Sequence, residues 1–330
     1  MDQGSGGNIF RVYSCLRQGL RQAFGNCRPV QVGTGIVAVL TVQSFTSVLA
    51  EDLENTRPGE GKVFLWWLGQ AGFALKSKNC FLLIDPFLSD YLAKKYAGKE
   101  FDHRRLMPSP VHPGKLRGLD AVLVTHRHSD HMDPETLPVL AQNNPRCRFV
   151  IPRAEADRAL EIGLPEGNLV KLNAGESAAP ADGFRVRALP AAHEELTLNG
   201  SGEHLFLGYA LLMEGICLYH SGDCVPYPDQ VYQLGSAASD LGAARIDAAM
   251  LPVNGRDEFR RSRNVPGNFT IAEAAALCAS AGIPLLFAHH FGMFAFNTAD
   301  PADLRRDSAG KTSAPRRIIC SPGHRYRIGL

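Results

Sequence analysis

Short apolar runs separated by turn residues follow one another along most of the chain beyond residue 60. Each run has three to six residues, a length that is typical of buried strands rather than helices. We therefore expect strands at residues 64–68, 73–76, 81–84, 121–125, 149–151, 185–189, 209–213, 216–219, 248–253 and 285–288. The first two flank Gly69-Gln70-Ala71-Gly72 and predict a hairpin, and Glu214-Gly215 predicts a second tight turn.

Two segments carry the start signals of helices. Asp133 followed by Pro134 predicts an N-cap and a first helical residue. Thr270 and Glu273 have the spacing of a capping box ahead of the Ala-rich segment 271–281. Because strands outnumber helices and many connections are too short for crossover helices, the pattern predicts mixed or largely antiparallel sheets with helices outside them.

The chain has 330 residues, of which 45% are hydrophobic, so it can bury a large core. Residues 1–50 carry four arginines and one aspartate, a charge of +3, which leaves −1 for the rest because the total is +2. This balance argues against a nucleic-acid partner for the main body. A change in composition at residues 51–62 predicts a helical N-terminal arm, residues 1–60, and a single domain, residues 61–330.

The cysteine pattern and the N-terminal arm bear on location. Eight scattered cysteines without a C-x-x-C pair indicate reduced thiols and a cytoplasmic protein. No run reaches the ~18 apolar residues of a membrane span. The basic, amphipathic arm leaves a targeting segment or a membrane-surface helix as alternatives to a helix packed on the domain.

The densest chemical signal is the segment His126-Arg127-His128-Ser129-Asp130-His131, which follows the apolar residues 121–124. Residues two apart on an extended segment point the same way, so His126 and His128 are expected to converge on one ion. Asp130 and His131 can face a neighbouring position as the chain turns. Imidazole and carboxylate ligands suit zinc, manganese or iron.

Five other polar residues also lie just after predicted apolar strands. They are Asp85, His193, Asp223, His289 and His290. Together they can complete a site for two metal ions, with Asp223 as the carboxylate between the ions. Asp85 is alternatively an outer acceptor that orients the histidine loop.

This ordered set resembles the motifs of the metallo-β-lactamase superfamily, and more closely those of its L-ascorbate-6-phosphate lactonase-like branch. The segments that carry the resemblance are Trp66–Gly72, Leu83–Pro86, Leu119–Asp133, Tyr219–Asp223, Leu251–Arg256, Gly267–Thr270 and His289–Gly292. One position departs from the lactonase pattern, because that branch has an acidic residue where this chain has His193.

The resemblance implies an α/β fold, a four-layer αββα sandwich with the metal site at one edge of the two sheets. It also implies a hydrolase that uses metal-bound hydroxide, with one or two divalent ions, zinc or manganese. It assigns His126, His128 and His193 to one ion. It assigns Asp130, His131 and His290 to the other ion, and Asp223 to both ions.

The remaining candidates concern proton transfer and substrate. Asp130 is expected to orient the nucleophile or carry a proton, and His220 is a second catalytic candidate. Asn254 and Arg256 are expected to face the substrate, since the planar fork of Arg256 suits a carboxylate or phosphate. A structural ion pair is the alternative for Arg256. His289 is expected to lie behind His290, because the spacing to Phe291-Gly292 favours His290 as the ligand.

These residues leave three functions open. The first is hydrolysis of a lactone of a small sugar derivative, phosphorylated or not. The second is a phosphodiesterase that resembles N-acyl-phosphatidylethanolamine phospholipase D, and the third is a metal-binding protein without turnover. In the first, the partner is a small-molecule substrate. The resemblance to the lactonases also implies a homo-oligomer.

Overall fold

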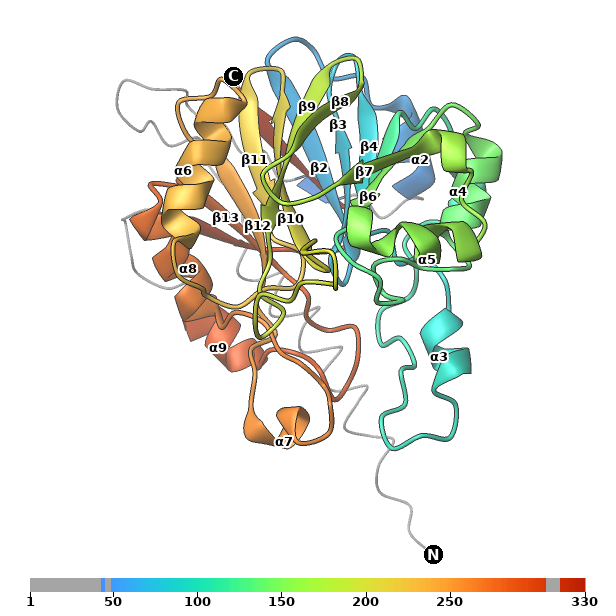
Figure 1. The fold of residues 1–330 in the computed structure, drawn as a ribbon, viewed down its shortest axis with the longest axis vertical. Coiled ribbons are helices and arrows are strands. Elements are labelled where there is room, and N and C mark those ends of the chain that lie inside the picture. Colours follow the sequence, from blue (N-terminus) through green and yellow to red (C-terminus); the bar gives the residue numbers. More distant parts are fainter. Residues whose placement is uncertain (1–42, 45–48, 307–314, 330) are drawn as a thin grey trace, which may run out of the picture.

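The computed structural model describes residues 43–44, 49–306 and 315–329, and two mixed β-sheets form its centre (Figure 1). The first sheet has eight strands. In spatial order they are β1 (Gln43–Ser44), β15 (His324–Gly329), β2 (Lys62–Gly69), β3 (Gly72–Lys76), β4 (Phe81–Ile84), β5 (Ala121–Leu123), β6 (Arg148–Pro152) and β7 (Leu169–Leu172). Strands β4 to β7 are parallel and the others are antiparallel.

The second sheet has seven strands. In order they are β14 (Arg316–Ile319), β13 (Leu285–His289), β12 (Ala248–Pro252), β11 (Ile216–His220), β10 (Leu207–Met213), β9 (Phe184–Pro190) and β8 (Ser177–Ala181). Strands β11 to β14 are parallel, and β8 to β11 are antiparallel. The predicted mixture of parallel and antiparallel pairing is therefore confirmed in both sheets.

Helices cover the outer faces of the two sheets and complete the four layers (Figure 1). On the side of the first sheet lie α2 (Leu49–Asn55), α4 (Leu137–Asn143) and α5 (Ala156–Glu161). On the side of the second sheet lie α6 (Gln230–Asp240), α8 (Ile271–Ser280) and α9 (Pro301–Arg306). Two short helices, α3 (Tyr91–Lys95) and α7 (Glu258–Arg261), lie on projecting loops.

The alternation of side chains along each strand divides the core in two. Trp67 and Phe73 belong to the larger cluster, which extends into the second sheet. Trp66 and Ala74 point the other way, into a cluster shared with α2 and α4. The run of apolar residues in β2 is continuous because both of its faces are buried, and this explains why its pattern does not alternate with polar residues.

The two predicted helix starts have different outcomes. The capping box of α8 is confirmed, since Thr270 and Glu273 each accept a backbone hydrogen bond from the other. The start at Asp133 is wrong, because α4 begins at Leu137. The Asp133 carboxylate accepts hydrogen bonds from the Ser89 and Thr136 hydroxyls, at 2.8 and 2.6 Å, which hold residues 133–136 in a turn.

The last part of the predicted N-terminal arm packs on the domain. Leu49 and Leu53 of α2 are buried in the cluster that contains Trp66. Asp52 accepts a hydrogen bond of 2.6 Å from Trp66 Nε1 and one of 2.9 Å from Arg325. Residues 1–42 lie outside the described residues, so the helical arm and the division at residue 60 stay predictions.

Truncation should distinguish α2 from the residues before it. A variant that begins at Gln43 keeps α2 and serves as the reference. A variant that begins at Pro58 loses the burial of Leu49 and Leu53, each of which contributes about 2 kcal/mol. Its free energy of unfolding should fall by about 4 kcal/mol, measured by tryptophan fluorescence. Equal stability of the two truncated proteins would contradict a structural role for α2.

Candidate metal centre

The predicted ligands follow strands of both sheets, and their side chains meet at one edge. The 126–131 loop follows β5, and Asp85 follows β4 in the same sheet. His193, Asp223 and His290 follow β9, β11 and β13 of the second sheet. The strand order of the two sheets therefore brings residues far apart in the sequence into one cluster.

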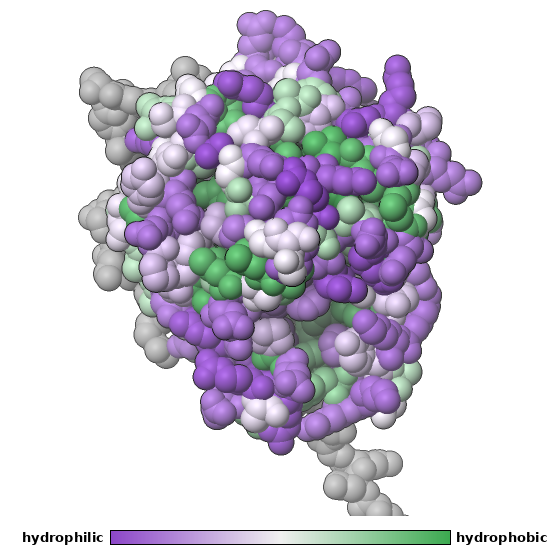
Figure 2. All heavy atoms as spheres, in the orientation of Figure 1, coloured by the Kyte–Doolittle hydropathy of each residue, from purple (hydrophilic) through white to green (hydrophobic). Residues whose placement is uncertain are grey.

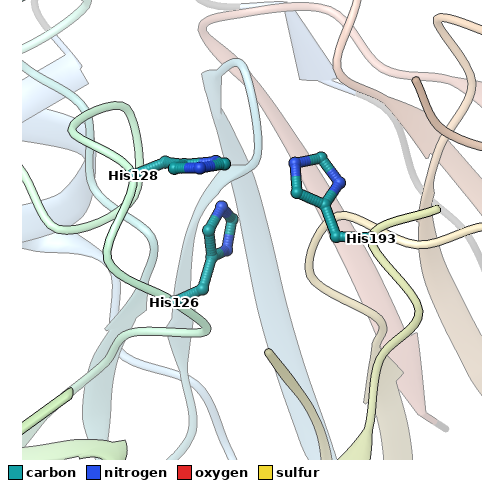
Figure 3. Close-up of side chains that lie close together, drawn as sticks. All are labelled: His126, His128 and His193. Carbon is teal, nitrogen blue, oxygen red and sulfur yellow. The ribbon is translucent and has the colours of Figure 1, made fainter. Parts of the chain in front are cut away.

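The first group of possible ligands is a set of three histidines. One ring nitrogen each of His126, His128 and His193 lies within 4.8 Å of the others. Figure 3 shows the three rings turned toward a common space, two from the 126–128 loop and one from the opposite side. Phe206 packs against the His126 and His193 rings with centroid distances of 5.1 Å. His193 is therefore not an isolated surface residue, because its side chain is only 4% exposed and faces the other histidines.

Two further groups contain the remaining candidates. Asp130, His131 and His290 form one group, and His126, His131 and Asp223 form the other. Asp223 approaches His290 Nε2 at 3.1 Å, His131 Nε2 at 3.5 Å and His193 Nε2 at 3.9 Å. The carboxylate therefore lies between the two sets of histidines, where a bridging ligand is expected.

The hydrogen-bonding state of the histidines fits a bound metal ion. In the described part of the chain, the buried ring nitrogens His126 Nε2, His131 Nε2 and both nitrogens of His193 have no hydrogen-bond partner. Such buried groups are costly unless a ligand satisfies them. Imidazole nitrogens with carboxylate oxygens are a donor set for divalent transition metals. The residues therefore fit a divalent metal site.

Burial and charge prepare the same side chains to bind a cation. Burial lowers the pKa of His126 well below its usual value and that of His193 to about 4, so both rings are neutral at pH 7. Burial alone would raise the pKa of Asp223, but His290 and His131 outweigh burial and hold that pKa well below its usual range. Neutral imidazoles and an ionised carboxylate are the forms that bind metal.

Asp85 lies behind the ligands. Its carboxylate accepts hydrogen bonds from His131 Nδ1 at 2.7 Å, from Thr125 N at 2.8 Å and from the Thr125 hydroxyl at 2.7 Å. These bonds fix the His131 ring so that Nε2 faces Asp223. Burial lowers the pKa of His131, but the carboxylates of Asp223, Asp85 and Asp130 raise it more. The pKa of His131 is therefore raised well above its usual value, whereas that of His126 is lowered.

The structure places His220 and His289 in the core beside the centre. His220 Nε2 donates to the Ala71 carbonyl oxygen at 2.9 Å, and His220 Nδ1 accepts from Gly222 N at 3.1 Å. Both nitrogens are thus used to join the β2–β3 turn to the loop that carries Asp223. The His289 ring stacks on His220, with centroids 5.0 Å apart. His290 rather than His289 contacts Asp223, and the catalytic role predicted for His220 gains no support from its contacts.

Asn254 and Arg256 line a different hollow from His128 and His193. Arg256 forms a two-point ion pair with Glu273 at 2.8 and 2.6 Å, which is the structural alternative for this residue. Asn254 donates to Asn297 at 2.7 Å and accepts from Asn268 at 3.0 Å. Both line a hollow of about 540 Å³ whose lining includes none of the candidate ligands. Their predicted contact with substrate stays a prediction.

Gln70 is a residue at the centre that the sequence pattern did not reveal. Its Nε2 donates to Asp130 Oδ2 at 2.8 Å and lies 3.1 Å from His290 Nε2. The Gln70 carbonyl oxygen accepts a bond of 2.9 Å from His290 N. Gln70 also has a φ of 50°, in the left-handed region. The only signal in the sequence is a long polar side chain inside a turn that otherwise contains Gly and Ala.

Comparison with known proteins agrees with this geometry. Residues 81–291 match the model of the β-lactamase superfamily domain, which is more than half of the chain. The chain belongs to this family. The resemblance to the metallo-β-lactamase superfamily and the predicted sandwich fold are therefore confirmed.

Curated relatives of this superfamily member include a lactonase. The probable L-ascorbate-6-phosphate lactonase UlaG of Escherichia coli O127:H6 is 28% identical over 223 residues, which cover 56% of this chain and 60% of the lactonase. An uncharacterized protein of Mycobacterium tuberculosis is 27% identical over 187 residues, which cover 57% of this chain and 47% of that protein. The matched region thus spans about half the length of these two relatives.

A solved structure shows the same fold. The metallo hydrolase Igni18 of Ignicoccus hospitalis superposes with a TM-score of 0.57 at 19% identity, covering 82% of this chain and 99% of Igni18. Within the described residues of this superfamily member, no helix is long and apolar enough to cross a membrane.

Acid should destabilise the metal-free protein through His193. Its pKa is 6.5 when unfolded and about 4 in the buried site, so between these values the unfolded chain binds the extra proton. Stability should therefore fall by about 3 kcal/mol as the pH falls from 6.5 to 4, and stay level for this group below pH 4. Urea unfolding at pH 7 and pH 4.5 measures the loss.

His193→Asn removes the titrating ring and should make this pH dependence smaller by that amount. His112→Asn, a substitution of an exposed histidine, is the matched control. An unchanged pH dependence in His193→Asn would contradict the buried, neutral state of His193.

Proposed function

We propose that this chain is a metal-dependent hydrolase that opens the ring of a lactone. The observation that carries the proposal is that six histidine and aspartate side chains lie together with Asp223 in three groups of possible metal ligands. The name of the lactonase relative supports the reaction class. We propose His126, His128 and His193 as ligands of one ion, Asp130, His131 and His290 as ligands of a second, and Asp223 as a ligand of both.

A divalent ion in such a centre supplies a water of lowered pKa, toward about 7, and polarises the carbonyl oxygen of the substrate. In lactone hydrolysis the water oxygen adds to the carbonyl carbon, the ring C–O bond breaks, and a proton passes to the ring oxygen. The product is a hydroxy acid.

Asp130 is the carboxylate that we propose as the carrier of this proton. Its side chain is 17% exposed, whereas Asp223 is 7% exposed and Asp85 is fully buried. Burial raises the pKa of Asp130, but His131 and His290 act against burial and the pKa is lowered, so the carboxylate is ionised and can accept a proton. Gln70 holds its Oδ2 in place.

Metal analysis combined with turnover tests the proposal. The purified protein should contain zinc or manganese, open a simple γ-lactone, and lose this activity when a chelator removes the metal. Restoration by added zinc or manganese identifies the ion that supports turnover. Hydrolysis of bis(p-nitrophenyl) phosphate without lactone opening would favour a phosphodiesterase instead. Metal binding without either activity would favour a binding protein.

The proposed location is the cytoplasm. The six cysteines within the described residues are all free and buried, as expected in a reducing compartment. Cys224, which lies beside Asp223 in the sequence, has its pKa raised to about 12 by burial and is not part of any ligand group. The homo-oligomer stays a prediction.

A further inference from the structure

The side chain of Gln70 lies against the second ligand group, which consists of Asp130, His131 and His290. Gln70 Nε2 donates to Asp130 Oδ2 at 2.8 Å and lies 3.1 Å from His290 Nε2. Asp130 Oδ2 in turn lies 3.8 Å from His131 Nε2, so it faces the third member of the group. An ion that enters this group therefore meets an N–H group that is already bonded to one ligand and close to another.

The ring nitrogens of the first ligand group are better prepared for an ion. This group consists of His126, His128 and His193, whose rings face a common space (Figure 3). Among the residues that the structure describes, His126 Nε2 and both ring nitrogens of His193 have no hydrogen-bond partner. An ion can bind these nitrogens without breaking a hydrogen bond, whereas at the second group it must break the bond between Gln70 and Asp130.

The Gln70 amide depends on Asp130 for its hydrogen bond. Gln70 is only 1% exposed, so water does not replace a lost partner. Its Oε1 is also buried and has no hydrogen-bond partner within the described parts of the chain. An ion that displaced Nε2 from Asp130 would therefore leave both polar atoms of the amide buried and unpaired. The loss of a buried hydrogen bond to a charged group corresponds to a factor of about 10 to 100 in an equilibrium constant.

The backbone holds Gln70 beside His290. The Gln70 carbonyl oxygen accepts bonds of 2.9 Å from His290 N and from Trp67 Nε1. Gln70 and His290 both have a left-handed φ, of 50° and 64°. Residues other than glycine keep such a conformation only where their surroundings fix it. The amide therefore stays at the second ligand group unless the whole β2–β3 turn moves.

We propose that Gln70 makes the two metal positions unequal, so that one ion binds tightly at the first ligand group and a second ion binds more weakly at the second. The inference rests on the metal centre of the proposed function and concerns its occupancy. When the first position alone is filled, Asp130 keeps its bond to Gln70 and does not bind metal. In this state it can act as the proton carrier of the proposed reaction.

The centre is accessible to ions from solvent. His128 and His193 line a pocket of about 700 Å³, and the Asp130 side chain is 17% exposed. Figure 2 shows a hollow in the lower part of the molecule, between the projecting segments that carry α3 and α7 in Figure 1. Zinc and a competing chelator should therefore exchange with the folded protein, and both binding steps can be measured by titration.

Calorimetric titration of the metal-free protein with zinc, in competition with a chelator, tests the inference. In the wild type, the second zinc should bind about tenfold or more weakly than the first. Gln70→Leu removes the N–H group from Asp130, so its second zinc should bind about tenfold or more tightly than that of the wild type, with the first changed less than about twofold. Repulsion between the two ions is present in both proteins, so the comparison between them isolates the effect of Gln70.

Gln230→Leu is the matched control. Gln230 is also buried, at 3% exposed, but it donates to the Cys224 sulfur at 3.6 Å and not to a proposed ligand. This variant should bind both ions as the wild type does. A second zinc that binds Gln70→Leu with unchanged or lower affinity would overturn the inference, and lower affinity would indicate that Gln70 is itself a ligand. Equal affinity of both steps in the wild type would also overturn it.

Crystals of the wild-type protein with one equivalent of zinc give a test that does not depend on how a variant folds. Anomalous scattering should place the zinc among His126, His128 and His193, and zinc beside His290 instead would overturn the inference. Because these measurements contain no substrate, they are separate from the test of the reaction. Two unequal steps without lactone opening would support the inference and overturn the lactonase function, and lactone opening with two equal steps would do the reverse.

Discussion

Replacement of Asp223 by Ala is expected to remove metal from the protein and to abolish hydrolysis. The Asp223 carboxylate lies 3.1 Å from His290, 3.5 Å from His131 and 3.9 Å from His193, so it approaches at least one histidine of each ligand group. Its loss leaves two groups of histidines without the negative charge between them. Activity should fall more than about 100-fold, beyond the effect typical of outer hydrogen-bond partners.

Elemental analysis after gel filtration measures the metal, and His126→Ala provides the comparison. His126 belongs to two of the three ligand groups, but it is absent from the group formed by Asp130, His131 and His290. His126→Ala should therefore keep part of the metal that Asp223→Ala loses. His112→Ala, a substitution of an exposed histidine, should keep both metal and activity. Wild-type metal content in folded Asp223→Ala would remove Asp223 from the centre.

Much of the fold could be predicted because each buried strand is a short run of apolar residues that is visible in the local sequence. Strand β4 begins and ends at the predicted residues 81–84, since its four side chains are all buried and turn residues flank it. Strand β8, with the sequence Ser-Ala-Ala-Pro-Ala, was missed. It lies at the edge of its sheet, is largely accessible to solvent, and contains a proline, so it lacks the apolar run by which a strand is recognised.

Helix α6 shows a second limit. Asp229, its N-cap residue, has a left-handed φ of 62° and makes no side-chain capping bond, so the start of the helix has no signal in the sequence. The helix is stabilised instead by burial of Leu234, Ala237 and Ala238 against the second sheet. Tertiary packing of this kind is not visible in the local pattern.

The candidate ligands could be predicted because all follow apolar strands, but their neighbours could not. The pairing of Arg256 with Glu273 depends on how α8 packs beside the loop after β12, and Glu273 already had a role in the capping box. Gln70 reaches Asp130 across 60 residues of sequence. In both cases the assembled sheets decide where a long side chain lies, so its partner could not be predicted from the local sequence.

Asp85→Asn should weaken metal binding although Asp85 does not face the ion. Its carboxylate accepts three hydrogen bonds, two from Thr125 and one from His131 Nδ1. An asparagine of the same shape must turn its NH₂ group toward one of these donors, so at least one bond is lost and the His131 ring is no longer fixed. We expect metal affinity to fall 10- to 100-fold, the range typical of such partners, with the metal ligands themselves unchanged.

Asp247→Asn is the matched control for this effect. Asp247 is also a buried carboxylate, and it accepts a hydrogen bond of 3.0 Å from Cys217 N at the start of β11, at the opposite end of that strand from Asp223. Both variants should lose some stability toward urea, but only Asp85→Asn should release metal to a competing chelator at lower concentration. Equal metal affinity in the two variants would show that Asp85 supports only the fold. The loss of a buried carboxylate acceptor would then change metal affinity equally at either end of the sheet.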